Sequence, residues 1–128
     1  MEKKTVDLQD EVKQFIFVHI KSVAELEVLL FIFRQPTKRW TSRFLSQELR
    51  SNPSYAESLL QQLAKTGLLE KTESSKEYCF NTSLDSEIRI IQEIERLYQT
   101  RRLSLINLIY ESPTDKIRTF ADAFKIRN

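Results

Sequence analysis

The chain has 128 residues, 41% of them hydrophobic and 30% charged, so it can bury one modest core and is not expected to be disordered. One glycine and three prolines are too few for the many tight turns of a sandwich or barrel, so we expect a mainly α-helical fold. The net charge of +2 is weakly basic and does not by itself indicate binding to nucleic acid.

Two helices are predicted in the first 35 residues. Apolar side chains recur at three- and four-residue spacing over residues 7–20, so residues 1–21 are expected to form an N-terminal helical segment. Ser22 opens the second helix, and Glu25 completes a capping box with it. This helix is expected to end before Pro36, because the residue preceding a proline avoids helical angles.

Two shorter helices are predicted next. Thr41 is the expected N-cap of the first of them, and Asn52 is the expected N-cap of the second. Pro53 then occupies a first helical position, where the missing amide costs nothing. Gly67, the only glycine, is expected to end the second helix in the left-handed conformation.

The hydrophobic period changes after Gly67. Residues 69–72 and 78–81 are two short strand candidates, and the polar residues 73–77 between them favour a turn. They predict a small β-hairpin that completes a domain spanning residues 22–83.

A long apolar stripe over residues 84–111 predicts one continuous helix that Pro113 ends. One small domain cannot cover such a stripe alone, so we expect part of it to be the surface of a two-fold homodimer. A helix folded back over its own domain is the alternative. The residues expected at the dimer interface are Ile88, Ile91, Tyr98, Leu105 and Leu108.

The tail, residues 112–128, has helical spacing at Ile117, Phe120 and Phe124. These side chains fit docking on the chain's own domain as well as they fit a motif bound in the groove of a protein partner.

Basic side chains cluster ahead of the two shorter helices. Residues 34–50 hold five arginines or lysines against one glutamate, a net of +4. This local excess favours contacts to DNA phosphates over an ordinary solvated surface. The residues expected to make them are Arg34, Lys38, Arg39 and Arg43. Trp40, within this run, is interpreted as a core residue more readily than as a stacking platform.

Metal-binding and catalytic residue types are scarce. Cys79 is the only cysteine and His19 the only histidine, which leaves no internal disulfide and no zinc cluster within one chain, and we expect no cofactor. A buried thiol and a packed imidazole are expected rather than a redox or pH sensor. No nucleophile–base set or glycine-rich phosphate loop indicates an enzyme. The N-terminus lacks a signal-peptide pattern and no apolar run could span a bilayer, so a cytoplasmic protein without a membrane partner is expected.

Residues 44–49 (FLSQEL) and 52–71 (NPSYAESLLQQLAKTGLLEK) resemble the supporting helix, recognition helix and first wing strand of bacterial winged helix-turn-helix regulators. The nearest type is the multiple-antibiotic-resistance regulator (MarR type). The resemblance implies a mainly α fold with a β-hairpin wing and flanking N- and C-terminal helices, and a homodimeric transcriptional regulator that binds double-stranded DNA. Lys76 of the wing would then contact phosphate. The recognition helix would read a pseudo-palindromic site in the major groove with Ser54, Tyr55, Ser58, Gln61 and Gln62.

Two features depart from that family. Glu57 and Ser58 stand on the expected recognition helix where an arginine or another strong hydrogen-bond donor is usual, and Glu57 is expected to face DNA phosphates unfavourably unless it accepts from a cytosine amino group. The expected wing tip, residues 73–77, is acidic and lacks arginine. They leave open a second hypothesis, a degenerate winged helix that binds proteins and not DNA. A third hypothesis adds a small aromatic effector bound among phenylalanines that are more readily explained as core, namely Phe15, Phe17, Phe31 and Phe33.

Overall fold

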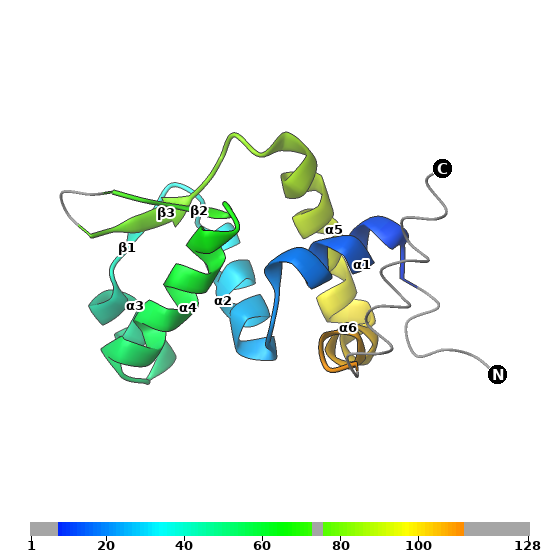
Figure 1. Ribbon diagram of the computed structural model, residues 1–128, viewed down its shortest axis with the longest axis horizontal. Helices are drawn as coiled ribbons and strands as arrows, with labels where there is room; N and C mark the ends of the chain where they lie inside the picture. The colour runs from blue at the N-terminus through cyan, green and yellow to red at the C-terminus, as the bar shows by residue number, and fades with distance from the viewer. Residues whose placement is uncertain (1–7, 73–75, 112–128) are drawn as a thin grey trace. The chain divides into compact units, whose positions relative to one another are not determined.

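The computed structural model describes residues 8–72 and 76–111 of the chain, and over them the fold is mainly helical with a small antiparallel sheet. They divide into two compact units, Ala24–Leu84 and the described residues outside that range. In chain order the elements are α1 (Asp10–His19), α2 (Val23–Phe33), β1 (Arg39–Trp40), α3 (Ser42–Leu49), α4 (Pro53–Lys65), β2 (Leu69–Lys71), β3 (Tyr78–Phe80), α5 (Asp85–Thr100) and α6 (Arg102–Ile109), as Figure 1 shows.

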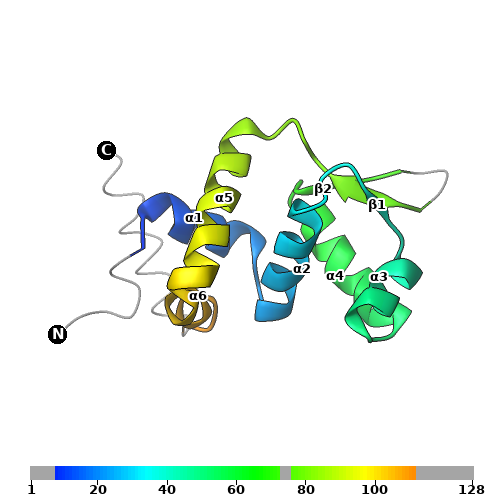
Figure 2. The same ribbon diagram turned by 180° about the vertical axis from the view of Figure 1, so that it is seen from behind.

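Helix α3 begins where the sequence predicts. The Thr41 hydroxyl oxygen accepts a hydrogen bond from the backbone N–H of Phe44 at 3.1 Å, which satisfies one of the amides that the first helical turn leaves without a partner. The chain leaves α2, forms β1 and then descends into α3 (Figure 2). At the C-terminal end of α3, Arg50 takes a left-handed conformation with φ of 56° and turns the chain toward α4. The hydrogen bond from the Phe44 N–H to the Thr41 hydroxyl confirms the predicted N-cap of α3.

Both predicted ends of α4 are also confirmed. The Asn52 side-chain oxygen accepts from the N–H of Tyr55 at 2.8 Å, and Pro53 is the first helical residue. After Lys65, the N–H of Gly67 bonds to the carbonyl of Ala64 at 3.0 Å, and the N–H of the next residue reaches the carbonyl of Leu63 at 3.2 Å. This pair of bonds is a Schellman motif, which requires the left-handed φ of +93° that Gly67 supplies.

The sheet contains the predicted hairpin and one strand that was not predicted. Strands β2 and β3 pair antiparallel, and β1 pairs with the other edge of β3, giving the order β1-β3-β2. In this register Trp40 lies opposite Tyr78. Strand β1 has only two residues, too few to show the alternation of side chains by which a strand is recognised in a sequence.

The core of Ala24–Leu84 forms between the helices and the sheet. Trp40 is fully buried, and its ring stacks on that of Phe44 with centroids 5.1 Å apart and lies 5.2 Å from that of Phe31. The interpretation of Trp40 as a core residue is confirmed. The inward face of α4 adds four buried side chains, namely Ala56, Leu59, Leu60 and Leu63.

The second unit is built from α1, α5 and α6. Helix α1 packs against both α5 and α6. Its buried side chains include Phe15 and Ile16. The buried side chains of the other two helices are Ile91, Ile94, Leu97, Leu105, Leu108 and Ile109. In the part of the chain that the structure describes, no helix is both long and apolar enough to cross a membrane.

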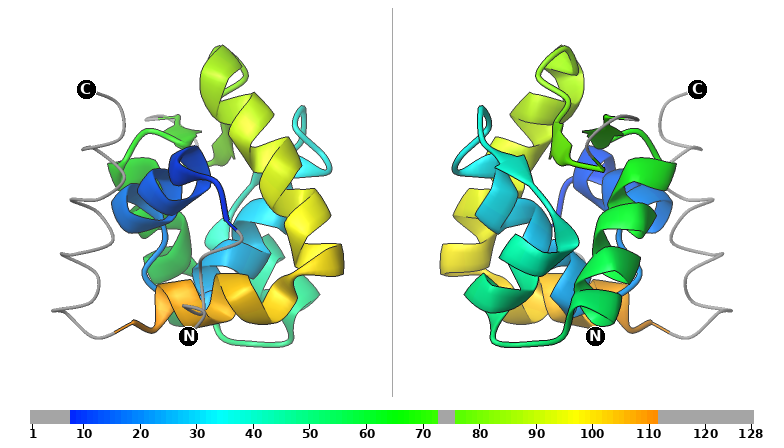
Figure 3. Two further views of the ribbon diagram at one scale, coloured as in Figure 1. Left: turned by 90° about the vertical axis from the view of Figure 1, so that its right-hand side faces the viewer. Right: turned by 90° about the vertical axis from the view of Figure 1, so that its left-hand side faces the viewer.

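The prediction of one continuous helix over residues 84–111 is wrong. The helix breaks at Arg101, whose φ of −137° and ψ of 42° are not helical, and α6 then turns away from α5 (Figure 3). Four residues after the buried Leu97, a continuous stripe would need an apolar side chain, and the exposed Arg101 stands there instead. The Thr100 hydroxyl also donates to the carbonyl of Arg96 at 3.0 Å, a local bond that tends to bend helices.

This break changes which side chains are available to a second copy of the chain. Three of the five residues expected at the dimer interface, Ile91, Leu105 and Leu108, are fully buried within the single chain. Their assignment to a dimer surface is therefore wrong for this structure, since the turn into α6 lets both helices bury them against α1. Ile88 and Tyr98 are half-buried, and their role stays a prediction. The tail residues Ile117, Phe120 and Phe124 lie outside the described residues.

Candidate nucleic-acid interface

The outer face of α4 carries most of the residues that the sequence predicts for base reading. Ser54, Ser58 and Gln61 are exposed and follow one another at helical spacing, so they share one face of the helix. Tyr55, at the edge of that face, is 45% exposed. Gln62 is half-buried and lies further round toward the core, so it presents less of its amide than Gln61 does.

Glu57, the only carboxylate on α4, lies beside this face, and three side chains converge on it. Its Oε2 atom accepts from the Tyr78 hydroxyl at 2.7 Å and from Gln61 Nε2 at 2.9 Å, and it lies 4.0 Å from Lys71 Nζ. Tyr78 is on β3 and Lys71 is on β2, so this carboxylate joins α4 to the hairpin. The negative charge of Glu57 is therefore hydrogen-bonded and ion-paired within the unit.

The Tyr78 hydroxyl can only be the donor in this arrangement, because an ionised carboxylate accepts hydrogen bonds and does not donate them. Burial, the hydrogen bond to Glu57 and the negative charge of that carboxylate together raise the pKa of Tyr78 to about 12, and burial is the largest of the three causes. The phenol therefore stays protonated at any pH at which proteins are ordinarily assayed.

Basic side chains surround a hollow next to α4. The hollow has a volume of about 460 Å³, and three cations line it: Arg43 from α3, Lys71 from β2 and Lys76, which precedes β3 by two residues. Its remaining wall contains Thr41 and Ser42, at the N-terminal end of α3, and the engaged Glu57. A helix N-terminus carries a partial positive charge. An anion in this hollow would therefore be attracted both by the three cationic side chains and by the N-terminus of α3.

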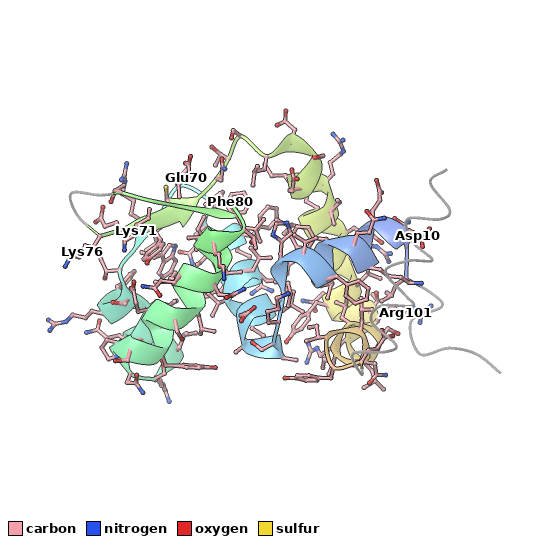
Figure 4. All side chains as sticks on the ribbon, in the orientation of Figure 1. Asp10, Glu70, Lys71, Lys76, Phe80 and Arg101 are labelled. Atoms are coloured by element: carbon pink, nitrogen blue, oxygen red, sulfur yellow. The ribbon has the colours of Figure 1, made fainter. Side chains whose placement is uncertain are left out.

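Figure 4 labels Lys71 and Lys76 on the hairpin. Of the five residues expected to contact phosphate, the structure places Arg43 and Lys76 at this hollow and the other three elsewhere. Lys38 lies over the rings of Trp40 and Phe44, with its Nζ 4.9 and 4.6 Å from their centroids.

The remaining two predicted phosphate contacts lie along the connection out of α2. Arg39 of β1 forms an ion pair at 3.8 Å with Glu77, the residue before β3, and Arg34 follows the end of α2. Both are exposed, so they remain able to contribute to the electrostatic field of this surface.

Sequence reasoning missed Lys71. Strict alternation along β2 places it on the same face as the buried Leu69, which would suggest an inward side chain. The structure agrees on the face, but Lys71 extends past the edge of the core and meets Glu57 and the ring of Tyr78, whose centroid is 5.4 Å from Nζ. The sequence offered one sign of this role, namely a lysine at a core-facing position of the predicted strand, close to the turn of the hairpin.

Other chemistry finds little support in the described residues. Among residues 8–72 and 76–111, no three His, Cys, Asp or Glu side chains are grouped so that they could hold a metal ion. Cys79 is half-buried on β3. In the second unit, burial lowers the pKa of His19 below its usual value, against an opposing contribution from Glu87, and its ring packs 4.5 Å from that of Phe15.

No family model, curated protein or solved structure matches this chain.

Proposed function

We propose that the chain is a DNA-binding transcriptional regulator whose helix α4 enters the major groove. The observation that carries the proposal is the pairing of two surfaces on Ala24–Leu84. An exposed polar face on α4 provides hydrogen-bonding groups for base edges, and a hollow lined by Arg43, Lys71 and Lys76 lies directly beside it. Base contacts specify a sequence, while phosphate contacts provide affinity and position, and this unit has candidates for both.

The order of the elements supports a winged helix-turn-helix as the finer description of this unit. Helices α3 and α4 are joined by a short turn at residues 50–52, and the β2–β3 hairpin follows as the wing. In this reading α4 is the recognition helix, with Ser54, Tyr55, Ser58 and Gln61 nearest the bases. Because Glu57 is hydrogen-bonded to Tyr78 and Gln61 and lies 4.0 Å from Lys71 Nζ, its carboxylate repels phosphates less than an unpaired one would.

The phosphate contacts can be tested through the salt dependence of binding. Fluorescence anisotropy with a labelled 30-base-pair duplex should show tight binding at 50 mM salt that weakens steeply by 200 mM, since each neutralised phosphate contributes about 0.9 to the logarithmic slope. The variants Arg43→Glu and Lys71→Glu should each weaken binding to all sequences and lower that slope by about one. Arg89→Glu on α5, an equal change in charge at an exposed site, is the matched control.

Two results would count against the proposal. A folded wild-type protein that retains no duplex at 50 mM salt is not a DNA-binding protein. Retention of full affinity and slope in both hollow variants would remove the hollow from the interface. The first result would favour the alternative function, a winged helix that binds another protein.

We also propose that the regulator is a homodimer that reads a pseudo-palindromic site. Two large side chains at α6 support this. Leu103 on the helix is 69% exposed, and Tyr110, the residue that follows the helix, is 62% exposed. They present apolar surface that a second copy would cover. A two-fold dimer would set the two α4 helices about 34 Å apart, one turn of DNA. Sedimentation equilibrium of wild type and Leu103→Glu tests it: a wild-type monomer at binding concentrations contradicts the dimer.

A further inference from the structure

The hydrogen bond between Glu57 and Gln61 fixes which way round the Gln61 amide is held. Gln61 lies one helical turn after Glu57 on α4, and its Nε2 atom donates to Glu57 Oε2 at 2.9 Å. A glutamine amide has a donor side and an acceptor side, whereas an ionised carboxylate can only accept. The nitrogen, and not the oxygen, must therefore face Glu57.

The Glu57 carboxylate is itself anchored from outside the helix. The Tyr78 hydroxyl reaches the same oxygen at 2.7 Å, and Tyr78 is only 1% exposed, so its position is set by the core of the unit. Lys71 Nζ, 4.0 Å from that oxygen, holds the charge toward the hairpin. Anchoring of this kind restricts the rotamers of a surface glutamate that would otherwise move freely.

With one N–H given to Glu57, the exposed edge of Gln61 consists of Oε1 and the other N–H. That pair matches the major-groove edge of adenine, where the N6 amino group donates to the oxygen and N7 accepts from the nitrogen. Turning the amide over would exchange its donor and acceptor and break the match to an adenine at the same step.

We propose that Glu57 is a positioning residue that orients the Gln61 amide to read one adenine in each half-site. This inference rests on the proposed DNA-binding function and assigns the specificity within it. Glu57 touches no base in this arrangement and acts through Gln61. The acidic residue that departs from the expected pattern thereby becomes part of the readout.

The experiment is a selection of bound duplexes from a random library at low salt, followed by measurement of affinity for the selected site and for its single-base variants. Wild type should prefer adenine at one position of each half-site by roughly 5- to 150-fold, the range for a good bidentate pair. Gln61→Ala should reduce that preference to about 1 and leave the other positions unchanged. Gln92→Ala, an exposed glutamine on α5, is the control and should behave as wild type.

Glu57→Gln separates positioning from folding, because the new amide can donate as well as accept and no longer dictates how Gln61 lies. It should reduce the adenine preference several-fold while overall affinity is kept or increased by the loss of a negative charge. In the Gln61→Ala background, Glu57→Gln should have no further effect on that preference, which is the signature of two residues acting as a unit. The midpoint of urea unfolding for each variant establishes that it is folded.

An adenine preference that persists in Gln61→Ala, or that Glu57→Gln leaves intact, would overturn the inference while leaving DNA binding in place. An equal effect of Glu57→Gln with and without Gln61 would show that Glu57 acts through the fold or on the base directly. Recovery of no duplex by folded wild type would instead refute the proposed function, and the inference with it.

Discussion

Replacing Tyr78 by phenylalanine tests whether the contact between α4 and the hairpin stabilises Ala24–Leu84. The substitution removes one hydroxyl, keeps the buried ring and changes no charge. Glu57 Oε2 then loses its donor at 2.7 Å but keeps the amide of Gln61. The measured difference should therefore come from a single hydrogen bond.

The size of that difference follows from the environment of the pair. A hydrogen bond to a charged group contributes about 1.5–3 kcal/mol. The Glu57 side chain is 32% exposed, so water can replace part of the lost interaction, and the lower end of the range applies. We expect a loss of about 1.5 kcal/mol in the free energy of unfolding, or about 1 M in the urea midpoint for a typical denaturant slope.

The contribution should also depend on pH, with a sign fixed by the direction of the pKa shift. An unperturbed tyrosine titrates near pH 10, and the pKa of Tyr78 is raised to about 12 by burial, by its bond to Glu57 and by that residue's charge. A group whose pKa is raised by folding stabilises the folded state fully below its unfolded pKa and loses that effect as pH rises. The stability gap between wild type and Tyr78→Phe should be constant from pH 7 to about 9 and shrink between about pH 10 and 12.

Urea unfolding followed by the fluorescence of Trp40, the only tryptophan, measures this gap directly. Trp40 is buried in the same unit and lies opposite Tyr78 in the sheet, so it reports on the relevant transition. Tyr55→Phe is the control, since it removes a hydroxyl from an exposed tyrosine of α4 and should change stability by less than about 0.5 kcal/mol. Equal midpoints for wild type and Tyr78→Phe at pH 7, or a gap that widens above pH 10, would refute the reasoning.

Three further predictions concern the ends of helices and the corrected C-terminal helices. Asn52→Ala removes the cap of α4 and should cost about 1 kcal/mol in urea unfolding, and an unchanged midpoint would show that the cap is dispensable. Gly67→Ala should cost about 1–2 kcal/mol from its left-handed φ alone, because an added Cβ meets nothing within 4 Å; a neutral result would contradict the strain. Leu105→Ala should cost about 2–5 kcal/mol in thermal unfolding followed by circular dichroism, and the exposed Val18→Ala on α1 should cost under about 0.5; similar costs would place the two side chains in similar surroundings.

The parts of the fold that sequence reasoning predicted are those with local causes. Thr41, Asn52 and Gly67 each act on backbone groups within a few residues, through side-chain caps or a left-handed turn, so the residue type alone carries the information. The inward face of α4 follows in the same way from the 3.6-residue period.

The parts that were missed depend on tertiary contacts. Strand β1 exists because β3 offers it an edge, and two residues carry no period of their own. Arg101 itself and the Arg102 and Leu103 that follow it are good helix formers, and one threonine before them does not ordinarily end a helix, so local propensity gives little warning of the break. The one sign of the break in the sequence was the polar Arg101 at a position where the apolar stripe over residues 84–111 needs an apolar side chain. Listing only the isoleucines and leucines of the stripe does not reveal this gap.

The candidate site shows the same difference between features with local causes and features that depend on tertiary contacts. Exposure of Ser54, Ser58 and Gln61 could be predicted, because it follows from helical periodicity. The surroundings of Glu57 could not, since its main partner, Tyr78, is 21 residues away in the sequence. Lys71 was missed for the same reason, because its meeting with Arg43 and Lys76 depends on how the hairpin lies on α3 and α4.

The charge balance around the hollow shows why an acidic residue on α4 is compatible with DNA binding. Arg43, Lys71 and Lys76 contribute three positive charges and Glu57 one negative charge, which leaves a net of +2 facing the solvent. Two unit charges 4 Å apart interact by only about 1 kcal/mol in water and about 4 kcal/mol near a protein surface, so Glu57 offsets the lysine nearest to it and little more. Because Tyr78 donates to that carboxylate and Lys71 Nζ lies 4.0 Å from it, its negative charge is held toward the hairpin. Replacing Glu57 should therefore keep or strengthen general affinity for DNA while weakening the choice between bases, whereas replacing a carboxylate that merely repels phosphate would leave that choice unchanged.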